Sequence, residues 1–402
     1  MEKDDAAVQP KPARNPGALL EILAVSAKLG VTSFGGPIAH LGYFHNEYIR
    51  RRKWMDERSY ADLVALCQFL PGPASSQVGI AIGVIRAGLL GGLTAWLGFT
   101  LPSVIALVLF AFLLQGFDIG SAGWIHGLKI VAVAIVAQAI LGMGQKLAPD
   151  RNRATIAVLV AAVTVLWQTP FSQVLLIGIA GIVGMLLFKN TQIPNESNFP
   201  VPISRSIAVL CLGVFFGLLI LLPVLRQFAA GEWLALFDSF YRSGSLVFGG
   251  GHVVLPILES EVVPTGWISK SGFLAGYGAA QAVPGPLFTF AGYLGAMISG
   301  VTGAIIATVA IFLPAFLLIV GALPFWNTLR KSAKVQGALT GVNAAVVGIL
   351  LAALYNPLWT TAILSSADFV LAAVLFMMLV FWKLPPWVVV IAGAVGGMLI
   401  VV

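Results

Sequence analysis

The chain is an internal duplication in which unusual motifs recur at a nearly constant spacing. The spacing is 213 to 215 residues for five pairs: Phe34-Gly35-Gly36 with Phe248-Gly249-Gly250, Pro71-Gly72-Pro73 with Pro284-Gly285-Pro286, Gln68 with Gln281, Trp54 with Trp267, and Trp167 with Trp382. Matches that keep one spacing over a whole chain mark repeated structural units. The sequence therefore predicts two homologous halves, residues 17–190 and 228–402. Residues 191–227 form a linker with one additional apolar helix, and residues 1–16 form a flexible, polar cytoplasmic tail.

Composition places the duplicated unit in a membrane. The 402 residues are 59% hydrophobic and only 10% charged, with a mean hydropathy of +0.96. Soluble domains carry about 25% charged residues, which excludes a water-soluble enzyme, a disordered regulator and a nucleic-acid-binding protein. The net charge of +7 is typical of basic cytoplasmic loops in a membrane protein. We predict an all-α polytopic membrane protein.

Four apolar segments are interrupted by clusters of glycine and proline. The breaks are Gly35-Gly36-Pro37 in segment 18–45, Pro71-Gly72-Pro73 in segment 59–86, Gly249-Gly250-Gly251 in segment 231–256, and Pro284-Gly285-Pro286 in segment 271–298. A break within the bilayer frees backbone polar groups, which is tolerated only inside protein or beside a water-filled cavity. We expect discontinuous helices here, and favour re-entrant hairpins with their tips at the breaks over full spans.

The loop charges of the two halves are reversed. Arg50–Lys53 is a basic loop, whereas its counterpart near Glu259 and Glu261 contains only Lys270 as a basic residue. Residues 146–153 contain three basic residues, and the counterpart 355–368 contains none. Since Lys and Arg in short loops stay cytoplasmic, the halves are predicted to be inverted relative to each other, with the N-terminus cytoplasmic and the C-terminus periplasmic.

Each Pro-Gly-Pro break precedes residues suited to the start of a helix. Proline is favoured at the first helical position, so a helix is predicted to begin at Pro73 and another at Pro286. The first turn would present backbone N–H groups together with the hydroxyls of Ser75, Ser76 or Thr289, an arrangement that binds oxyanions. Inverted repeats with broken helices are typical of secondary transporters that bind substrate at the midplane.

Charged residues within the apolar segments are also duplicated. Lys28 and Arg242 occupy equivalent positions, as do Glu47 and Glu261. A cation inside a membrane costs about 2.5–3.5 kcal/mol on insertion scales, so two at equivalent positions indicate a shared role, such as attraction of a dianion. The two acids are interpreted either as ion-pair partners or as proton carriers that couple transport.

The predicted anion site combines the two cations with the break residues. Its members are Lys28, Arg242, Gly35, Gly36, Pro37, Gly249, Gly250, Gly251, Gln68, Pro71, Gly72, Pro73, Ser75, Ser76, Gln281, Pro284, Gly285, Pro286 and Thr289. Simpler roles stay open at this point. Glycines can serve close helix packing, the cations can snorkel to an interface, and the hydroxyls can bond their own helix backbone. The sequence contains no set of catalytic residues, no metal-ligand spacing and no cofactor motif.

The paired motifs resemble those of the chromate ion transporter family in its long, fused two-domain form. The resemblance rests on Lys28-Leu29-Gly30, Ser33–Pro37, Tyr48–Trp54, Leu66–Pro73, Phe248–His252 and Gln281–Pro286. It implies an inner-membrane transporter that exports the chromate dianion and confers chromate resistance, driven by the proton-motive force. It also implies sulfate, which is nearly isosteric, as a substrate or competitor. A channel or a transporter for sulfate or another oxyanion remains an alternative, and a homodimer is one option for the assembly.

Overall fold

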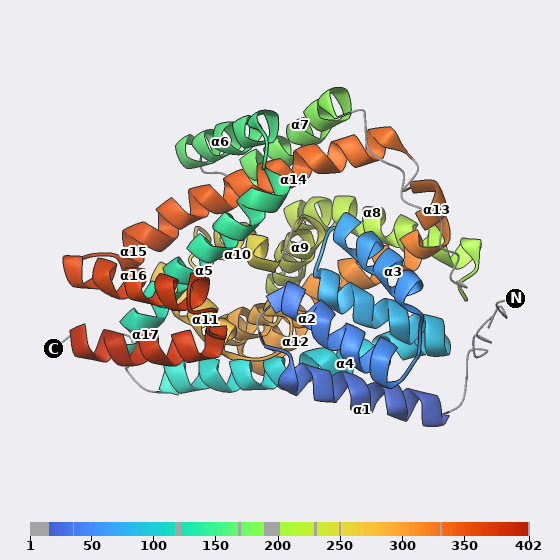
Figure 1. The fold of residues 1–402 in the computed structure, drawn as a ribbon, viewed down its shortest axis with the longest axis horizontal. Coiled ribbons are helices and arrows are strands. Elements are labelled where there is room, and N and C mark those ends of the chain that lie inside the picture. Colours follow the sequence, from blue (N-terminus) through green and yellow to red (C-terminus); the bar gives the residue numbers. More distant parts are fainter. Residues whose placement is uncertain are drawn as a thin grey trace, which may run out of the picture.

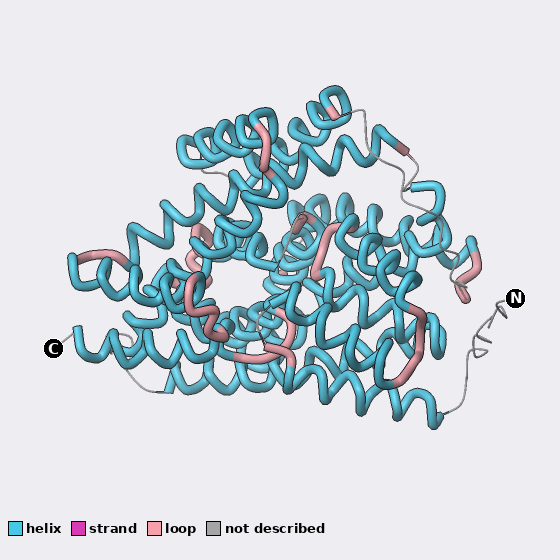
Figure 2. Tube along the Cα trace, viewed as in Figure 1, coloured by secondary structure: helices cyan, strands magenta, loops and turns pink. Residues whose placement is uncertain are grey.

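The computed structural model describes residues 16–34, 36–116, 123–167, 170–188, 202–228, 231–248, 251–329 and 332–400, and these ranges are helical without any strand (Figure 2). Within them, five helices are long and apolar enough to cross a bilayer, and three shorter apolar helices accompany them. The prediction of an all-α polytopic membrane protein is confirmed. The predicted tail up to residue 15 and the glycines at 35, 249 and 250 lie outside the described residues.

The first repeat contains the elements labelled α1 to α7 (Figure 1). Their bounds are α1 Pro16–Thr32, α2 Gly36–Phe44, the π-helix η1 His45–Arg51, α3 Glu57–Phe69, α4 Ala74–Gly116, α5 Gly123–Leu147, α6 Arg151–Leu166 and α7 Pro170–Leu187. A single long helix, α8 (Arg205–Phe228), follows as the predicted linker helix. The breaks predicted near residues 35 and 72 are present, between α1 and α2 and between α3 and α4.

The second repeat has matching elements in the same order. They are α9 Glu232–Ser245, η2 Gly251–Val253, α10 Val254–Val262, α11 Lys270–Ala282, η3 Leu287–Thr289, α12 Phe290–Ala322, η4 Leu323–Phe325, α13 Trp326–Leu329, α14 Ala333–Ala353, η5 Leu354–Trp359, α15 Thr360–Ala362, α16 Ser366–Val380 and α17 Pro386–Ile400. Breaks again separate α9 from α10 and α11 from α12. The sequence duplication is therefore a duplication of broken helices.

Equivalent residues start equivalent helices. Asp56 caps α3 by accepting the backbone N–H of Ser59 at 2.9 Å, and Ser269 caps α11 by accepting that of Gly272 at 3.1 Å. Such side chains satisfy one of the N–H groups that have no partner within the helix, which fixes the first residue of the helix. The short helices that lead into the two Pro-Gly-Pro breaks are thus defined locally.

The long helices α4 and α12 each fold back on themselves near one end. Their backbones leave helical geometry at Ala87-Gly88 and Ser299-Gly300, where the glycines have φ +70° and +62°. A Cβ on Gly83 would lie 2.3 Å from the carbonyl oxygen of Gly91, so the segments before and after the turn pack in backbone contact. The parts of α4 before and after this turn are therefore two antiparallel helices, of which the first, from residue 74 to 86, is about two thirds of the length of a membrane span.

Charge contacts show that the broken segments of the first repeat return to the side from which they start. Glu21, in the first turns of α1, bonds Arg52 at 2.7 Å and Arg86 at 2.6 Å. Arg86 also lies over the ring of Trp54, with 4.2 Å between the guanidinium carbon and the ring centroid. The start of the first segment, the loop that follows it, and the end of the second segment consequently lie together. This arrangement is a pair of re-entrant hairpins, as the fold prediction states.

The two repeats exchange their C-terminal helices. α5 of the first repeat packs on α16 and α17 of the second, and α14 of the second repeat packs on α6 and α7 of the first, while α4 and α12 contact each other at the centre (Figure 1). The contact of one repeat's long helix with the last two helices of the other thus occurs twice with the repeats interchanged, which is the pattern of a two-fold interface. The broken segments are held between these interchanged helices.

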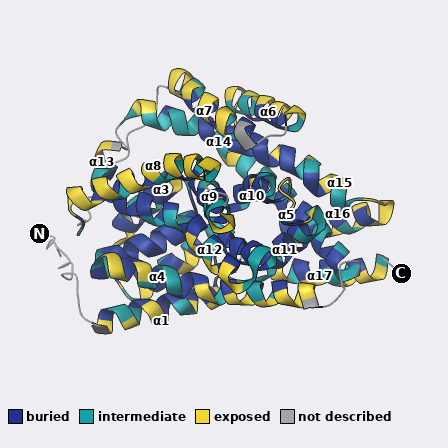
Figure 3. Cartoon of the chain, turned by 180° about the vertical axis from the view of Figure 1, so that it is seen from behind, coloured by how far each residue is buried: buried dark blue, intermediate teal, exposed yellow. Residues whose placement is uncertain are grey.

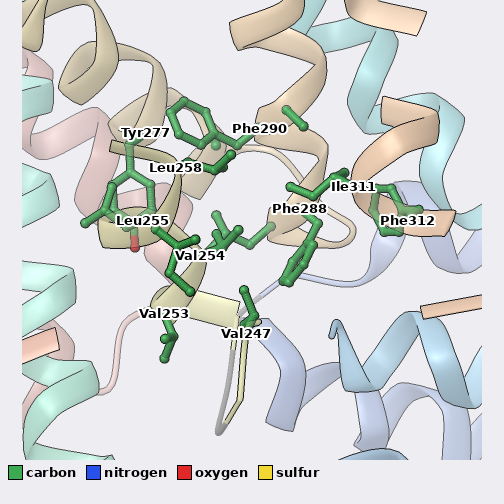
Figure 4. Close-up of a cluster of buried hydrophobic side chains, with 14 of the residues drawn as sticks. Val247, Val253, Val254, Leu255, Leu258, Tyr277, Phe288, Phe290, Ile311 and Phe312 are labelled. Carbon is green, nitrogen blue, oxygen red and sulfur yellow. The ribbon is translucent and has the colours of Figure 1, made fainter. Parts of the chain in front are cut away.

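The outer surface is apolar, and the tightest packing lies in the second repeat. α8 exposes many large apolar side chains (Figure 3). Only 17% of the residues in its most apolar 18-residue stretch are buried, as expected for a lipid-facing helix. By contrast, 72% of the residues in the most apolar 18-residue stretch of α12 and its flanking turns are buried. Figure 4 shows Val254, Phe288 and Phe290 of the second repeat in one cluster with Ile311, next to the breaks. A rigid core therefore supports the junction of the broken helices.

Candidate substrate site at the helix breaks

The two Pro-Gly-Pro breaks are joined to the opposite repeat by reciprocal backbone hydrogen bonds. Gly72 donates its N–H to the carbonyl of Val247 at 2.7 Å, and Gly285 donates its N–H to the carbonyl of Ser33 at 2.8 Å. Val247 and Ser33 are equivalent residues, each directly before the Phe-Gly-Gly motif of its own repeat. Each break thus bonds the other break of the opposite repeat, and the two bonds are related by the approximate two-fold axis.

A further contact lies at the axis itself. Gly251 and Pro37 are equivalent residues, and a Cβ on Gly251 would lie 3.5 Å from Cγ of Pro37. The same Cβ would lie 3.7 Å from Cβ of Leu287, the first residue after the second Pro-Gly-Pro motif. The structure therefore brings together breaks that are more than 200 residues apart in sequence, as a common substrate site requires.

Helices restart within one residue of the predicted positions Pro73 and Pro286, and helical turns also begin at the two glycine-rich breaks. α2 begins at Gly36, α4 at Ala74, η2 at Gly251 and η3 at Leu287. Such first turns carry backbone N–H groups without an intrahelical partner and the positive end of the helix dipole. Four helix starts with such groups consequently lie at the breaks, two in each repeat.

The predicted hydroxyls at these starts have different partners. Ser75 lies 3.2 Å from Nδ1 of His40, and Thr289 donates to the carbonyl of Pro286 at 2.7 Å. Ser76 is buried, and its hydroxyl has no partner in the described part of the chain. Thr289 thus braces its own break, whereas Ser76 retains free hydrogen-bonding capacity.

The predicted glutamines differ from each other in the same way. Gln281 has a buried side-chain nitrogen without a partner among the described residues, while Gln68 is exposed on the last turn of α3. Pro73 and Pro286 are buried, and Pro71 and Pro284 are half-buried. Within the described ranges, the buried polar atoms without a partner in or next to the breaks are Ser33 Oγ, Ser76 Oγ, Gln77 Oε1 and Gln281 Nε2. Because buried polar groups are nearly always bonded, this concentration indicates a place for water or a ligand.

Three residues at the junction are absent from the sequence prediction. Gln77 donates to the carbonyl of Pro71 at 2.8 Å, Ser103 of α4 donates to the carbonyl of Pro284, and His40 faces Ser75. Gln77 and His40 have sequence signals, since Gln77 directly follows Ser76 and His40 lies three residues after Pro37. Ser103 has none, because it lies in the long apolar part of α4 after the turn at Gly88 and reaches the opposite repeat.

The two predicted cations pair with the two predicted acids at equivalent positions. Lys28 Nζ lies 2.9 Å from Glu47 Oε2, and Arg242 forms two hydrogen bonds of 2.8 Å to the carboxylate of Glu261. Arg242 also bonds Asp238 twice, at 3.0 Å. Glu47 and Glu261 are therefore ion-pair partners of the two cations in this structure. The pairing reduces the net positive charge that Lys28 and Arg242 offer to an anion.

The two pairs differ in how fully the cation is used. The Lys28 side chain is 46% exposed, and an ammonium has three donors, so it can bind a second acceptor. Arg242 is 19% exposed and uses four of its five N–H groups in the bonds above, which leaves one on Nη1. Glu47 is further held by Arg52 at 2.9 Å and Arg51 at 3.4 Å. Lys28 is therefore the more available cation.

Comparison with known proteins agrees with this architecture. The family model described as "Chromate transporter" matches residues 20–185 and 234–398. The "Probable chromate transport protein" of Synechococcus elongatus is 28% identical over 364 residues, covering 87% of this chain and 86% of that protein. The "Chromate transport protein" of Pseudomonas aeruginosa is 28% identical over 343 residues, covering 83% and 80%.

A third relative has no assigned substrate. An "Uncharacterized transporter" of Methanocaldococcus jannaschii is 27% identical over 350 residues, covering 84% of each chain. No solved structure matches this chain. The family model matches twice, once per repeat, and together the two matches span most of the chain. This multi-pass membrane protein, built from two repeats of broken helices, belongs to the chromate transporter family.

Proposed function

We propose that the chain is a secondary transporter that exports the chromate dianion across the inner membrane and so confers chromate resistance. The observation that carries the proposal is the meeting of four helix starts at the junction of two repeats, with buried polar atoms that lack partners. Helix starts bind oxyanions, and broken helices between repeats form substrate sites in secondary transporters. Family membership supplies chromate as the oxyanion.

The proposed site uses the predicted residues in distinct roles. Backbone N–H groups after Pro73 and Pro286, with the hydroxyl of Ser76 and the amide of Gln281, contact the oxyanion. Lys28 contributes a positive charge that its partner Glu47 only partly uses. Gly72 and Gly285 allow the close backbone approach that joins the repeats. The two cross-repeat hydrogen bonds hold the breaks of the opposite repeats together at the site.

Transport is proposed to occur by alternating access. The two repeats rock relative to each other, and this movement exposes the site first to one side of the membrane and then to the other. With a cytoplasmic N-terminus and a periplasmic C-terminus, the inside-negative potential favours exit of a dianion by roughly 4.6 kcal/mol at 100 mV, since one charge contributes about 2.3 kcal/mol. Glu47 and Glu261 are proposed as the acids that couple a proton flux to this movement.

Radiolabelled chromate flux in proteoliposomes of the purified protein tests the proposal. We expect saturable flux that responds to an imposed potential and is inhibited by sulfate. Counterflow separates a carrier from a channel, because only a carrier accelerates labelled uptake against unlabelled internal substrate. Absence of chromate flux, with sulfate flux retained, would transfer the same mechanism to the alternative substrate. Absence of flux for both anions would refute the proposed function.

A further inference from the structure

A polar cavity of about 120 Å³ lies between the repeats, away from the helix breaks. Its walls come from the end of α6 and the start of α7 in the first repeat, and from α10, α11, α14 and η5 in the second. One water molecule occupies about 30 Å³ in the liquid, so the cavity has room for several waters or one small anion. The sequence motifs assign no role to this region.

The cavity is lined by donors suited to an oxyanion. Lys270 Nζ donates to Oδ1 of Asn356 at 3.1 Å, which leaves two ammonium N–H groups for another acceptor. Asn356 accepts this bond through its side-chain oxygen, so its amide nitrogen is the group that can donate to an anion. Thr164 is 8% exposed, and its hydroxyl has no partner within the described part of the chain. An ammonium, an amide and an orphaned hydroxyl on three separate elements form a donor set for one tetrahedral oxyanion.

A second, smaller cavity connects this donor set to the duplicated charge pair. It is lined by Arg242 and Glu261 and shares Gln173 and Ser260 with the larger cavity. Gln173 and Ser260 therefore lie between Lys270 and Arg242, the cation that sequence analysis places in the substrate site. The smaller cavity measures about 10 Å³, enough for about one water molecule, so passage of an anion between the two cavities requires their walls to move apart.

Two equivalent positions of the first repeat carry different residues. The residues equivalent to Glu259 and Lys270 are His45 and Glu57, so the basic member has changed position. His45 and Glu57 lie 3.3 Å apart and satisfy each other. The cavity with an available ammonium is therefore a feature of the second repeat, whose loop at Lys270 is predicted to be periplasmic.

We propose that the Lys270 cavity is a second oxyanion site, a vestibule that receives the dianion between the Arg242 cavity and the periplasm. Lys270, Asn356 and Thr164 donate to the anion oxygens. Glu259, which lines the same cavity, repels the anion and keeps its residence short, as an exit site requires. The role in export depends on the proposed function, whereas binding of the anion does not.

Protection of an introduced thiol from a hydrophilic thiol reagent tests the site in the full-length, detergent-solubilised protein. Ser260→Cys places the thiol where the two cavities meet, in a background of Cys67→Ala and Cys211→Ala. Sulfate is the probe, because chromate oxidises thiols. We expect sulfate to slow labelling of this thiol at least threefold, and not to slow labelling of Ser366→Cys, an exposed control. As a control, sodium chloride is added to sulfate-free samples to give the same ionic strength.

Charge variants identify the ligand group. Lys270→Gln is expected to raise the sulfate concentration needed for protection about tenfold, which corresponds to about 1.4 kcal/mol, because it removes a charged hydrogen-bond donor. Lys334→Gln removes an exposed lysine elsewhere and is expected to leave protection unchanged. Thr164→Val, which keeps the shape of the side chain, is expected to weaken protection less than Lys270→Gln.

The outcomes separate this site from the proposed function. An unprotected Ser260→Cys thiol, or a thiol that reacts only after denaturation, refutes the vestibule even if the parent protein transports chromate. Protection that is lost in Lys270→Gln supports the vestibule even if the parent transports no chromate. Protection that survives in Lys270→Gln refutes the assignment of the donor set.

Discussion

The two equivalent charge pairs are expected to respond very differently to loss of the cation. In Arg242→Gln, the carboxylates of Asp238 and Glu261 lose their shared partner while their side chains are only 1% and 9% exposed. Arg226 remains near Asp238 at 3.2 Å, but Glu261 has no other ion pair among the described residues. Removal of one partner from a buried pair costs about 3–5 kcal/mol, because the remaining charge is buried without compensation.

Lys28→Gln leaves a different situation. Glu47 keeps Arg52 at 2.9 Å and Arg51 at 3.4 Å, and the Lys28 side chain is 46% exposed. An ion pair with such an exposed member contributes about 0–1 kcal/mol after screening by solvent. The fold is therefore expected to lose several times more stability from Arg242→Gln than from Lys28→Gln, although the two positions are equivalent in sequence.

Thermal unfolding of purified variants in detergent, followed by fluorescence and by size-exclusion profile, measures this difference. We expect Lys28→Gln to remain monodisperse near the parent melting temperature and Arg242→Gln to melt at a clearly lower temperature. The double variant Arg242→Gln/Glu261→Gln is expected to recover part of the loss, since it removes the stranded charge. Equal destabilisation by the two single variants, or no recovery in the double variant, would refute the reasoning from burial.

The same comparison makes Lys28 the cleaner test of transport. Because Lys28→Gln is expected to keep the fold, its chromate flux reports on the substrate site rather than on stability. We expect a raised KM in proteoliposomes and partial rescue by Lys28→Arg. An unchanged KM and rate in a well-folded Lys28→Gln protein would exclude this cation from the site.

Three further perturbations address the packing around the breaks. Gly285→Ala places a Cβ 2.2 Å from Oγ of Ser103 at a backbone φ of +96°, so it is expected to lower the free energy of unfolding by about 2–3 kcal/mol. Ser103→Ala is expected to restore part of this loss, which melting of the two single variants and the double variant can check. Gly88→Ala is expected to cost about 1–2 kcal/mol because φ is +70° there, whereas Gly142→Ala in open space on α5 is expected to be neutral or stabilising in the same assay. His126→Ala removes a 2.7 Å bond to the buried aspartate of α16 and is expected to cost about 1.5–3 kcal/mol, with His126→Gln melting closer to the parent.

Local chemistry made much of the fold predictable from sequence. Glycine and proline act on the backbone of their own residues, so the breaks at Gly36 and Gly72 and the restart of helices after them follow from residue type. Caps such as Asp56 and Ser269 work over three residues. Because the chain is duplicated, breaks and caps predicted in one half are also predicted at the equivalent positions of the other half. Even the turn at Gly88 coincided with a boundary between two apolar segments.

The substrate site was predictable only in part. Equivalent positions identified Lys28, Arg242, Glu47 and Glu261, and the structure pairs each cation with an acid of its own repeat. The sequence left the ion-pair and proton-carrier interpretations open, because spacing along a chain does not fix which side chains meet across a hairpin. The sequence also did not predict the unequal exposure of Lys28 and Arg242, since exposure depends on neighbouring residues from other helices.

The sequence by itself determined that this protein is a membrane-embedded pair of repeats with interrupted helices, because hydropathy, glycine and proline act on segments of about twenty residues or fewer. Only the tertiary structure decided that Gly72 bonds Val247, that Gly285 bonds Ser33 and that Ser103 reaches Pro284. Those contacts join backbone carbonyls to partners in distant segments. Every residue has a carbonyl group, so no side-chain pattern records which one a distant helix break will meet.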